Sequence, residues 1–150
     1  PLLSEIDLFK ASLADIGEPG DDKRREIRQN FLLGKPIAQL SLVIAFMRLW
    51  QSEWDGGQKI TKKQICERFN EIDWRIDNPM WQRVLMNGDK IVSGRQAANF
   101  AGRFIAYLAG EPLEDVEYDA LEENYKGLFP HEEQKKVALP KRVFEAVAPA

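Results

Sequence analysis

The most apolar stretch of the chain sets the strongest constraint on its fold. Residues 37–50 read IAQLSLVIAFMRLW, and eleven of these fourteen residues are apolar. A helix that is apolar on every side is typical of a central helix covered by its neighbours. The stretch is shorter than the roughly 20 residues that a bilayer-spanning helix needs, so we expect no membrane as a partner. We therefore predict a buried helix over residues 37–53, with Pro36 at its start.

Helix start and stop signals surround this central segment. Thr61-Lys62-Lys63-Gln64 and Ser93-Gly94-Arg95-Gln96 each place a hydroxyl three residues before a glutamine, which is the pattern of a capping box. Glycines and prolines separate the remaining apolar patterns, and long alternating strand patterns are absent. We predict helices at 4–16, 22–33, 61–72, 79–85, 93–109 and 111–126, with one or two short helices after Pro130.

These elements predict an all-α fold class, a compact orthogonal bundle of six to eight helices around the central apolar helix (37–53). The 150 residues are enough for a single helical domain with its own core. Ala98, Ala101 and Gly102 are small, so we expect another helix to approach closely there. Because the chain begins with Pro1 and not with Met, we expect it to be a piece of a longer protein.

Two tryptophans flank a proline-bounded turn, DWRIDNPMW at residues 73–81. A buried indole removes some 150–250 Å² from water, which is enough to fix a corner between helices. Trp74 and Trp81 are therefore predicted to be interior wedges that pack on the 37–50 helix. The second interpretation is that both rings are exposed as anchors for a partner.

Signatures of an enzyme are scarce in this sequence. His131 is the one histidine and Cys66 the one cysteine, and no phosphate-binding glycine motif occurs. We expect Cys66 to be a buried thiol, without a disulfide, as in the reducing cytoplasm. The Asp73 and Asp77 carboxylates are expected to cap turns or to pair with Arg75 and Arg83. We therefore predict no catalytic residue, no metal site and no cofactor.

Charge is distributed unevenly along the chain, although the net charge is only −3. Residues 59–103 hold nine Lys or Arg and five Asp or Glu, whereas residues 111–133 hold one Lys and nine acidic residues. Such blocks are most simply solvated helix faces that pair with each other. The basic middle segment also suits contact with phosphate.

Several of the basic residues lie at predicted helix starts, where free backbone N–H groups favour an anion. The glycine-containing loop 87–96 adds Lys90. The connection between residues 72 and 79 is longer than the turn of a helix-turn-helix motif, which argues against that motif. If the chain contacts DNA, we expect phosphate positioning and not base reading. The candidate residues are Lys62, Lys63, Arg68, Lys90 and Arg95.

Four segments between Gly34 and Glu111, about half of the chain, resemble a known family. They read GKPIAQLSLVIAF, ITKKQICERFNEIDW, DNPMWQRVLMNGDKIVSGRQ and AGRFIAYLAGE, and they are similar to the C-terminal helical part of the DGQHR-domain family. This family includes the DndB-type proteins of DNA sulfur modification (phosphorothioation). The resemblance implies a bacterial cytoplasmic accessory or regulatory factor whose partners are DNA or the modification enzymes. The DGQHR stretch itself is not in this sequence, and no catalytic residue is carried over.

The sequence thus leaves two functional hypotheses. The first is a non-catalytic helical domain of a DNA sulfur-modification protein that binds the DNA backbone or a partner subunit. The second is a protein-interaction module unrelated to nucleic acid. It would use the acidic 111–126 helix against a basic partner, or Trp74 and Trp81 as exposed anchors.

Overall fold

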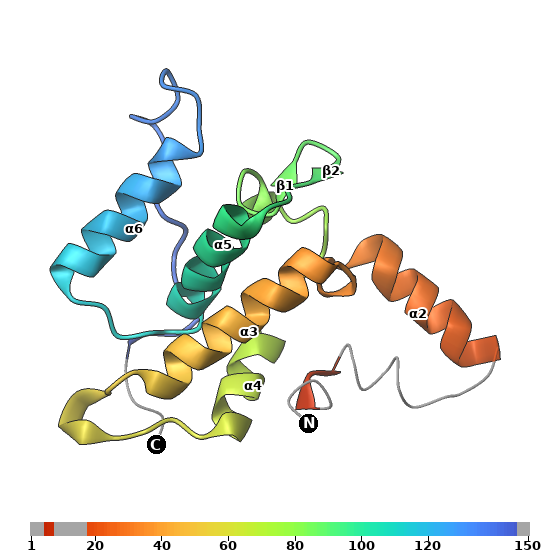
Figure 1. The fold of residues 1–150 in the computed structure, drawn as a ribbon, viewed down its shortest axis with the longest axis horizontal. Helices are drawn as coiled ribbons and strands as arrows, with labels where there is room; N and C mark the ends of the chain where they lie inside the picture. Colours follow the sequence, from red (N-terminus) through yellow and green to blue (C-terminus); the bar gives the residue numbers. More distant parts are fainter. Residues whose placement is uncertain (1–4, 8–17, 147–150) are drawn as a thin grey trace.

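The computed structural model describes residues 5–7 and 18–146, and it is mostly helical (Figure 1). Its five described α-helices confirm the helical character but not the predicted count of six to eight helices, and the described chain also holds one small hairpin. No helix among the described residues is long and apolar enough to cross a membrane. The elements are α2 (Glu18–Asn30), η2 (Leu32–Gly34), α3 (Pro36–Gln51), η3 (Asp55–Gly57), α4 (Lys62–Asn70), η4 (Pro79–Trp81), β1 (Met86–Asn87), β2 (Lys90–Ile91), α5 (Arg95–Leu108) and α6 (Asp115–Gly127).

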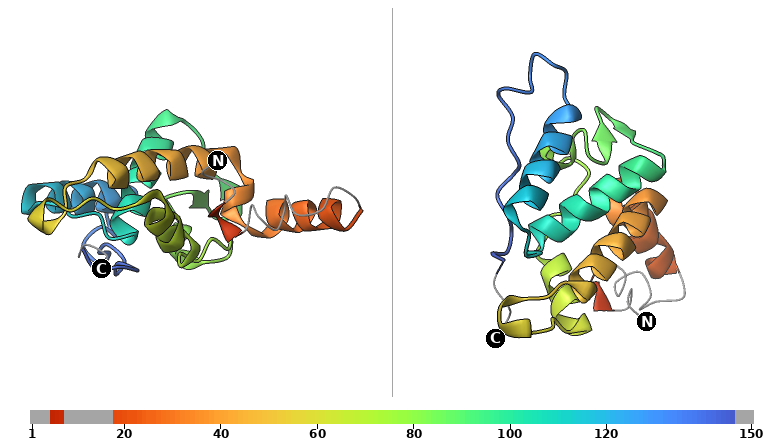
Figure 2. Two further views of the ribbon diagram at one scale, coloured as in Figure 1. Left: turned by 90° about the horizontal axis from the view of Figure 1, so that it is seen from below. Right: turned by 60° about the vertical axis from the view of Figure 1, so that its left-hand side comes forward.

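The centre of the molecule is the pair formed by α3 and α5, which run side by side in the same direction (Figures 1 and 2). This pair is not orthogonal. A side chain at Gly102 would meet Ile44 at 2.5 Å and the Ser41 carbonyl at 3.1 Å, so the missing side chain lets α5 lie against α3. The predicted close approach at the small residues of α5 is therefore confirmed.

The expectation that α3 is covered on every side is wrong. Leu42, Ala45 and Leu49 are completely buried, but one stripe of the helix remains in solvent. The neighbouring α5, α4 and η2 cover only the other faces of the helix. The exposed stripe, which we call the α3 apolar face, consists of Leu40, Val43, Met47 and Trp50, with exposed fractions of 51%, 45%, 44% and 41%.

The second helix differs from its predicted range of 22–33. It begins at Glu18, before the predicted start, and it ends at Asn30, before the predicted end. The end is set by a distant segment, because the backbone N–H of Leu32 donates to the Trp74 carbonyl at 2.8 Å and that of Ile76 donates to the Asn30 carbonyl at 3.0 Å. The helix predicted at 4–16 lies almost entirely outside the described residues.

No α-helix forms over 79–85, contrary to the prediction. Pro79–Trp81 makes a single 3-10 turn, and the chain then enters the hairpin of β1 and β2. Arg83 interrupts the helical pattern because its φ is +70° and its N–H donates to the Met86 carbonyl at 2.6 Å. The glycine-containing loop turns at Gly88, with a φ of +63° that glycine adopts easily.

Of the two predicted capping boxes, one forms and the other does not. Thr61 caps α4 with the predicted reciprocal bonds to Gln64. Ser93 does not cap α5, because the residue before the helix is Gly94, which has no side chain to offer. The acidic helix begins at Asp115 and not at 111, and its Val116 is 78% exposed.

The segment after Pro130 forms turns and extended backbone, so the short helices predicted there are absent from residues 130–146. This segment passes back along the end of α5. The N–H groups of Val143 and Phe144 donate to the Leu108 carbonyl at 3.0 and 3.1 Å, and the Tyr107 hydroxyl donates to the Pro140 carbonyl at 2.9 Å. These bonds hold the C-terminal segment against the core.

Candidate functional site

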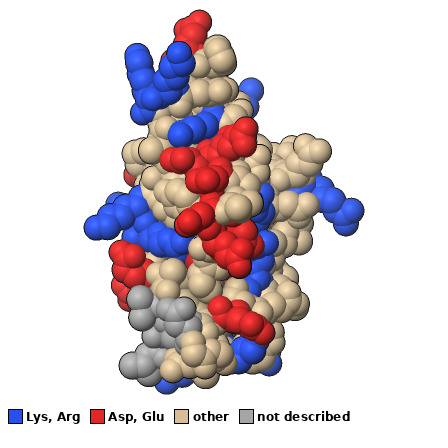
Figure 3. Space-filling view, turned by 90° about the vertical axis from the view of Figure 1, so that its left-hand side faces the viewer, with Lys and Arg blue, Asp and Glu red and all other residues tan. Residues whose placement is uncertain are grey.

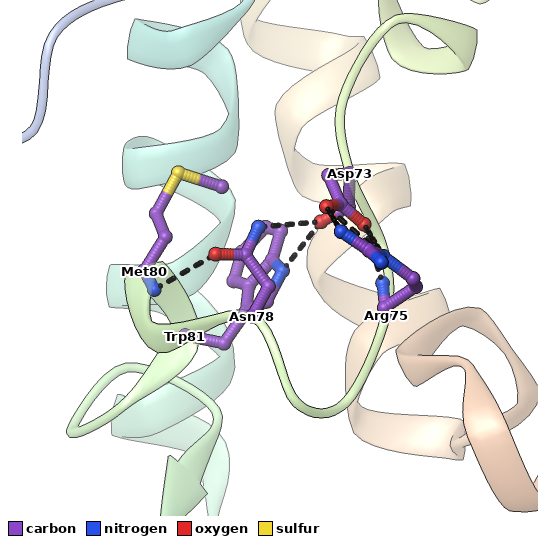
Figure 4. A network of polar contacts seen from close by, with 5 residues as sticks. All are labelled: Asp73, Arg75, Asn78, Met80 and Trp81. Carbon is purple, nitrogen blue, oxygen red and sulfur yellow. Dashed lines mark hydrogen bonds and ion pairs between the residues drawn. The ribbon is translucent and has the colours of Figure 1, made fainter.

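The corner between α4 and the hairpin is closed by its two tryptophans, of which Figure 4 shows Trp81. Trp74 and Trp81 are only 3% and 0% exposed. Each indole N–H reaches a carbonyl oxygen at 2.8 Å, that of Phe69 for Trp74 and that of Asp73 for Trp81. Trp81 also meets Phe104 of α5 edge to face, with ring centroids 6.1 Å apart. The predicted burial of both rings is confirmed, and the interpretation as exposed anchors is wrong. Packing of these rings on the 37–50 helix stays a prediction.

The polar residues of this corner stabilise its backbone. The Asn78 amide donates to the Asp73 carbonyl at 3.2 Å, and its side-chain oxygen accepts the Met80 N–H at 3.1 Å (Figure 4). The Asp73 carboxylate pairs with Arg75 at 2.6 Å, as predicted, and this hydrogen-bonded partner lowers the pKa of Asp73. The corner is therefore a structural element.

The candidate phosphate-contacting residues do not form one surface. Lys62 and Lys63 begin α4, near the C-terminal end of α3, whereas Lys90 lies on the hairpin and Arg95 begins α5. Figure 1 places the start of α4 and the hairpin toward opposite ends of α3. All four side chains are exposed, and Lys63 forms an ion pair with Glu67 at 3.8 Å. They make two separate basic sites.

Arg68, the fifth candidate for phosphate contact, is buried, unlike the other four. Its guanidinium is buried and donates to the Ala109 carbonyl at 2.7 Å. It lies between the rings of Trp54 and Phe144, at 5.1 and 4.9 Å from their centroids, and its burial lowers the pKa of Arg68. A charge held in this way joins α4 to the end of α5 and to the C-terminal segment, and it does not face a ligand in solvent.

The α3 apolar face is the candidate site that the structure adds. Its residues are spaced three, four and three apart, which places them in one line along the helix. Lys62 stands over the Trp50 ring, 5.4 Å from its centroid, and a cavity beside Trp50 is lined by Lys59. The spacing could have been found in the sequence, but the high apolar content of the whole segment concealed it.

The acidic residues form a band over the face that carries α6 (Figure 3). Glu111 differs from the rest because it is buried and receives two bonds from Arg48, at 2.9 and 3.2 Å. Burial raises the pKa of Glu111, although Arg48 opposes the shift. Five acidic residues at the start of α6 and along it are exposed, and their contact with a basic partner stays a prediction: Glu114, Asp115, Glu117, Asp119 and Glu123.

Comparison of the chain with protein-family models, with curated proteins and with solved structures found no match. The resemblance of residues 34–111 to the DGQHR-domain family therefore stays a prediction. The described residues 5–7 and 18–146 include no group of three or more His, Cys, Asp or Glu side chains placed to hold a metal ion.

Proposed function

We propose that this chain is a non-catalytic helical binding module of a bacterial, cytoplasmic accessory or regulatory protein of DNA sulfur modification. Its partner on this proposal is another protein subunit, which binds the α3 apolar face. The observation that carries the proposal is this face, where four large apolar side chains in one line are each at least 41% exposed. Contiguous exposed apolar surface of this kind is typical of interaction sites.

The chemistry of the face defines the partner. The three-four-three spacing fits the apolar stripe of an amphipathic helix laid along α3. Lys59 and Lys62 are exposed beside Trp50, and they favour carboxylates on that partner helix. The expected partner is thus an amphipathic helix with acidic residues along one edge, presented by a modification-enzyme subunit.

The test is a calorimetric titration of the purified chain with purified subunits of the DNA sulfur-modification enzymes. We expect one subunit to bind and Met47→Asp to weaken that binding at least about a hundredfold, because an unpaired charge would be buried in the interface. Val116→Asp is the matched control, since Val116 is 78% exposed on α6 and is not part of the α3 apolar face. Absence of binding by every subunit, or equal binding by the Met47→Asp variant, contradicts the proposal.

A second candidate is binding of the DNA backbone, which the exposure of Lys62, Lys63, Lys90 and Arg95 favours. The test is the affinity for duplex DNA as a function of salt concentration, because phosphate contacts release counterions. On this candidate Lys62→Ala combined with Arg95→Ala lowers both the affinity and its salt dependence. No binding at about 50 mM salt rejects it.

A further inference from the structure

A cleft on the other side of α5 has a different chemistry from the α3 apolar face. It lies among the hairpin region, α5 and α6, and its volume of about 540 Å³ is within the range of small-ligand sites. Arg83 and Arg103 line it, and no carboxylate does. The cavities beside Arg68 and beside Glu111 are smaller, at about 430 and 260 Å³, and each is lined by glutamates. This cleft therefore carries a net positive charge within its own walls.

The two guanidinium groups are available to a ligand. Within the described residues neither group takes part in a hydrogen bond or ion pair, although the charge of Arg103 acts on Glu111 across the neighbouring cavity. Both side chains are half-buried, which weakens the screening of their charge by water. An anion between them would gain charge-assisted hydrogen bonds of the kind that guanidinium forms with phosphate.

Arg83 also has an unusual backbone. Among the described residues it is the one non-glycine residue with a positive φ, at +70°. Such a conformation costs free energy in a residue with a side chain, and it occurs preferentially at functional sites. Here it turns the chain between Trp81 and the hairpin, so that Arg83 lines the cleft. Nothing in the turn itself requires an arginine, since glycine or asparagine adopts this φ at lower cost.

The remaining wall suits a nucleobase better than a bare anion. Gln96, Asn99 and Asn124 line the cleft, and each carboxamide offers both a donor and an acceptor, as base edges require. The half-buried ring of Phe100 gives an apolar surface on which a base can stack. From the charge, the amides and the ring together we infer that this cleft binds a nucleotide, with its phosphate between Arg83 and Arg103.

The test is calorimetric titration of the chain with inorganic phosphate, thymidine 5′-monophosphate and an eight-residue thymidine oligonucleotide at equal ionic strength. We expect the mononucleotide to bind at least about tenfold more tightly than inorganic phosphate. Equal affinity of oligonucleotide and mononucleotide identifies a free nucleotide as the ligand, and tighter binding of the oligonucleotide identifies an unpaired strand. Failure of both nucleotides to bind, or phosphate binding as tight as the mononucleotide, overturns the inference.

The variants locate the site. Arg83→Asn keeps the backbone conformation and removes the guanidinium, and combined with Arg103→Gln it should weaken nucleotide binding at least about tenfold. Arg25→Gln, an exposed arginine on α2, is the matched control and should leave binding unchanged. Binding that survives the double variant, or that falls equally in the control, contradicts the assignment. These variants do not change the α3 apolar face. Nucleotide binding and subunit binding are therefore tested independently of each other.

Discussion

Trp74 and Trp81 stack on each other inside the protein, with ring centroids 5.1 Å apart and planes inclined by 15°. The contact joins the two ends of a loop that contains no α-helix or strand. Each ring also donates a hydrogen bond to a backbone carbonyl within 3 Å. The stack thus connects α4 to the hairpin, and through Phe104 it connects both to α5.

Replacement of Trp81 by alanine should lower the free energy of unfolding by about 3–5 kcal/mol, because it leaves a cavity beside Trp74 and Phe104. Trp50→Ala is the control. Because the Trp50 side chain is 41% exposed, its replacement should lower the free energy of unfolding by far less. Urea denaturation of the three proteins measures both values, and similar losses for the two variants would show that the buried stack does not stabilise the fold.

The contact between α3 and α5 predicts opposite effects of alanine at two glycines. Gly127 has open space around its missing side chain, so Gly127→Ala should stabilise the protein by up to about 1 kcal/mol through helix propensity. Gly102→Ala should destabilise it, because the new carbon would lie 2.5 Å from Ile44 of α3. Thermal denaturation distinguishes them, and stabilisation by both changes would mean that α5 is free to move away from α3.

The two sides of α3 should respond differently to truncation. Leu42 is completely buried, so Leu42→Ala should cost about 2–5 kcal/mol. Leu40 is 51% exposed, so Leu40→Ala should change the unfolding free energy by about 0.5 kcal/mol or less. Chemical denaturation of the isolated chain provides the comparison. A large loss from Leu40→Ala would mean that the apolar face is covered within the chain itself.

Glu111 should make the protein less stable as the pH rises. Its pKa is raised by burial, so it holds its proton more tightly in the folded state than in the unfolded state. Its stabilising contribution is complete below the ordinary glutamate pKa and is lost as the pH rises through the folded-state value. The stability of the protein relative to its Glu111→Gln variant should therefore be greater at about pH 4 than at about pH 8.

Asp73 is the control for this pH effect because its shift has the opposite sign. Arg75 lowers the pKa of Asp73, so the contribution of Asp73 is present above its ordinary pKa and is lost as the pH falls. The effect should be small, since both side chains of the pair are largely exposed. Unfolding measured from about pH 2 to about pH 8 gives both trends, since the Asp73 contribution is lost only below its ordinary pKa. A difference in unfolding free energy between the protein and its Glu111→Gln variant that stays constant with pH would contradict the prediction for Glu111.

Arg68→Ala should affect stability and not nucleic-acid binding. The change leaves the buried Ala109 carbonyl without its donor and removes the group between Trp54 and Phe144, which should cost about 1–3 kcal/mol. DNA affinity at low salt should stay unchanged, whereas on the DNA candidate Lys62→Ala should reduce it. A loss of DNA binding in a stably folded Arg68→Ala variant would restore Arg68 to the phosphate-contacting set.

Features that depend on a few neighbouring residues could be predicted from the sequence alone. Thr61 and Gln64 form their capping box because both partners lie within one helical turn. The turn at Gly88 also depends on neighbouring residues alone. Burial of Trp74 and Trp81 was predictable because indole rings are largely apolar. The start of α5 shows the limit, since Gly94 and not Ser93 precedes that helix.

Features that depend on distant segments were decided by the tertiary structure. Pairing with residues 74–76 ends α2 at Asn30, and the carbonyl of Ala109 makes Arg68 an internal group. The exposed line of residues on α3 has the same cause. Hydrophobic periodicity shows which residues gain from burial. The number of neighbouring elements determines how many faces of a helix are covered. Here α5, α4 and η2 leave one face of α3 in solvent.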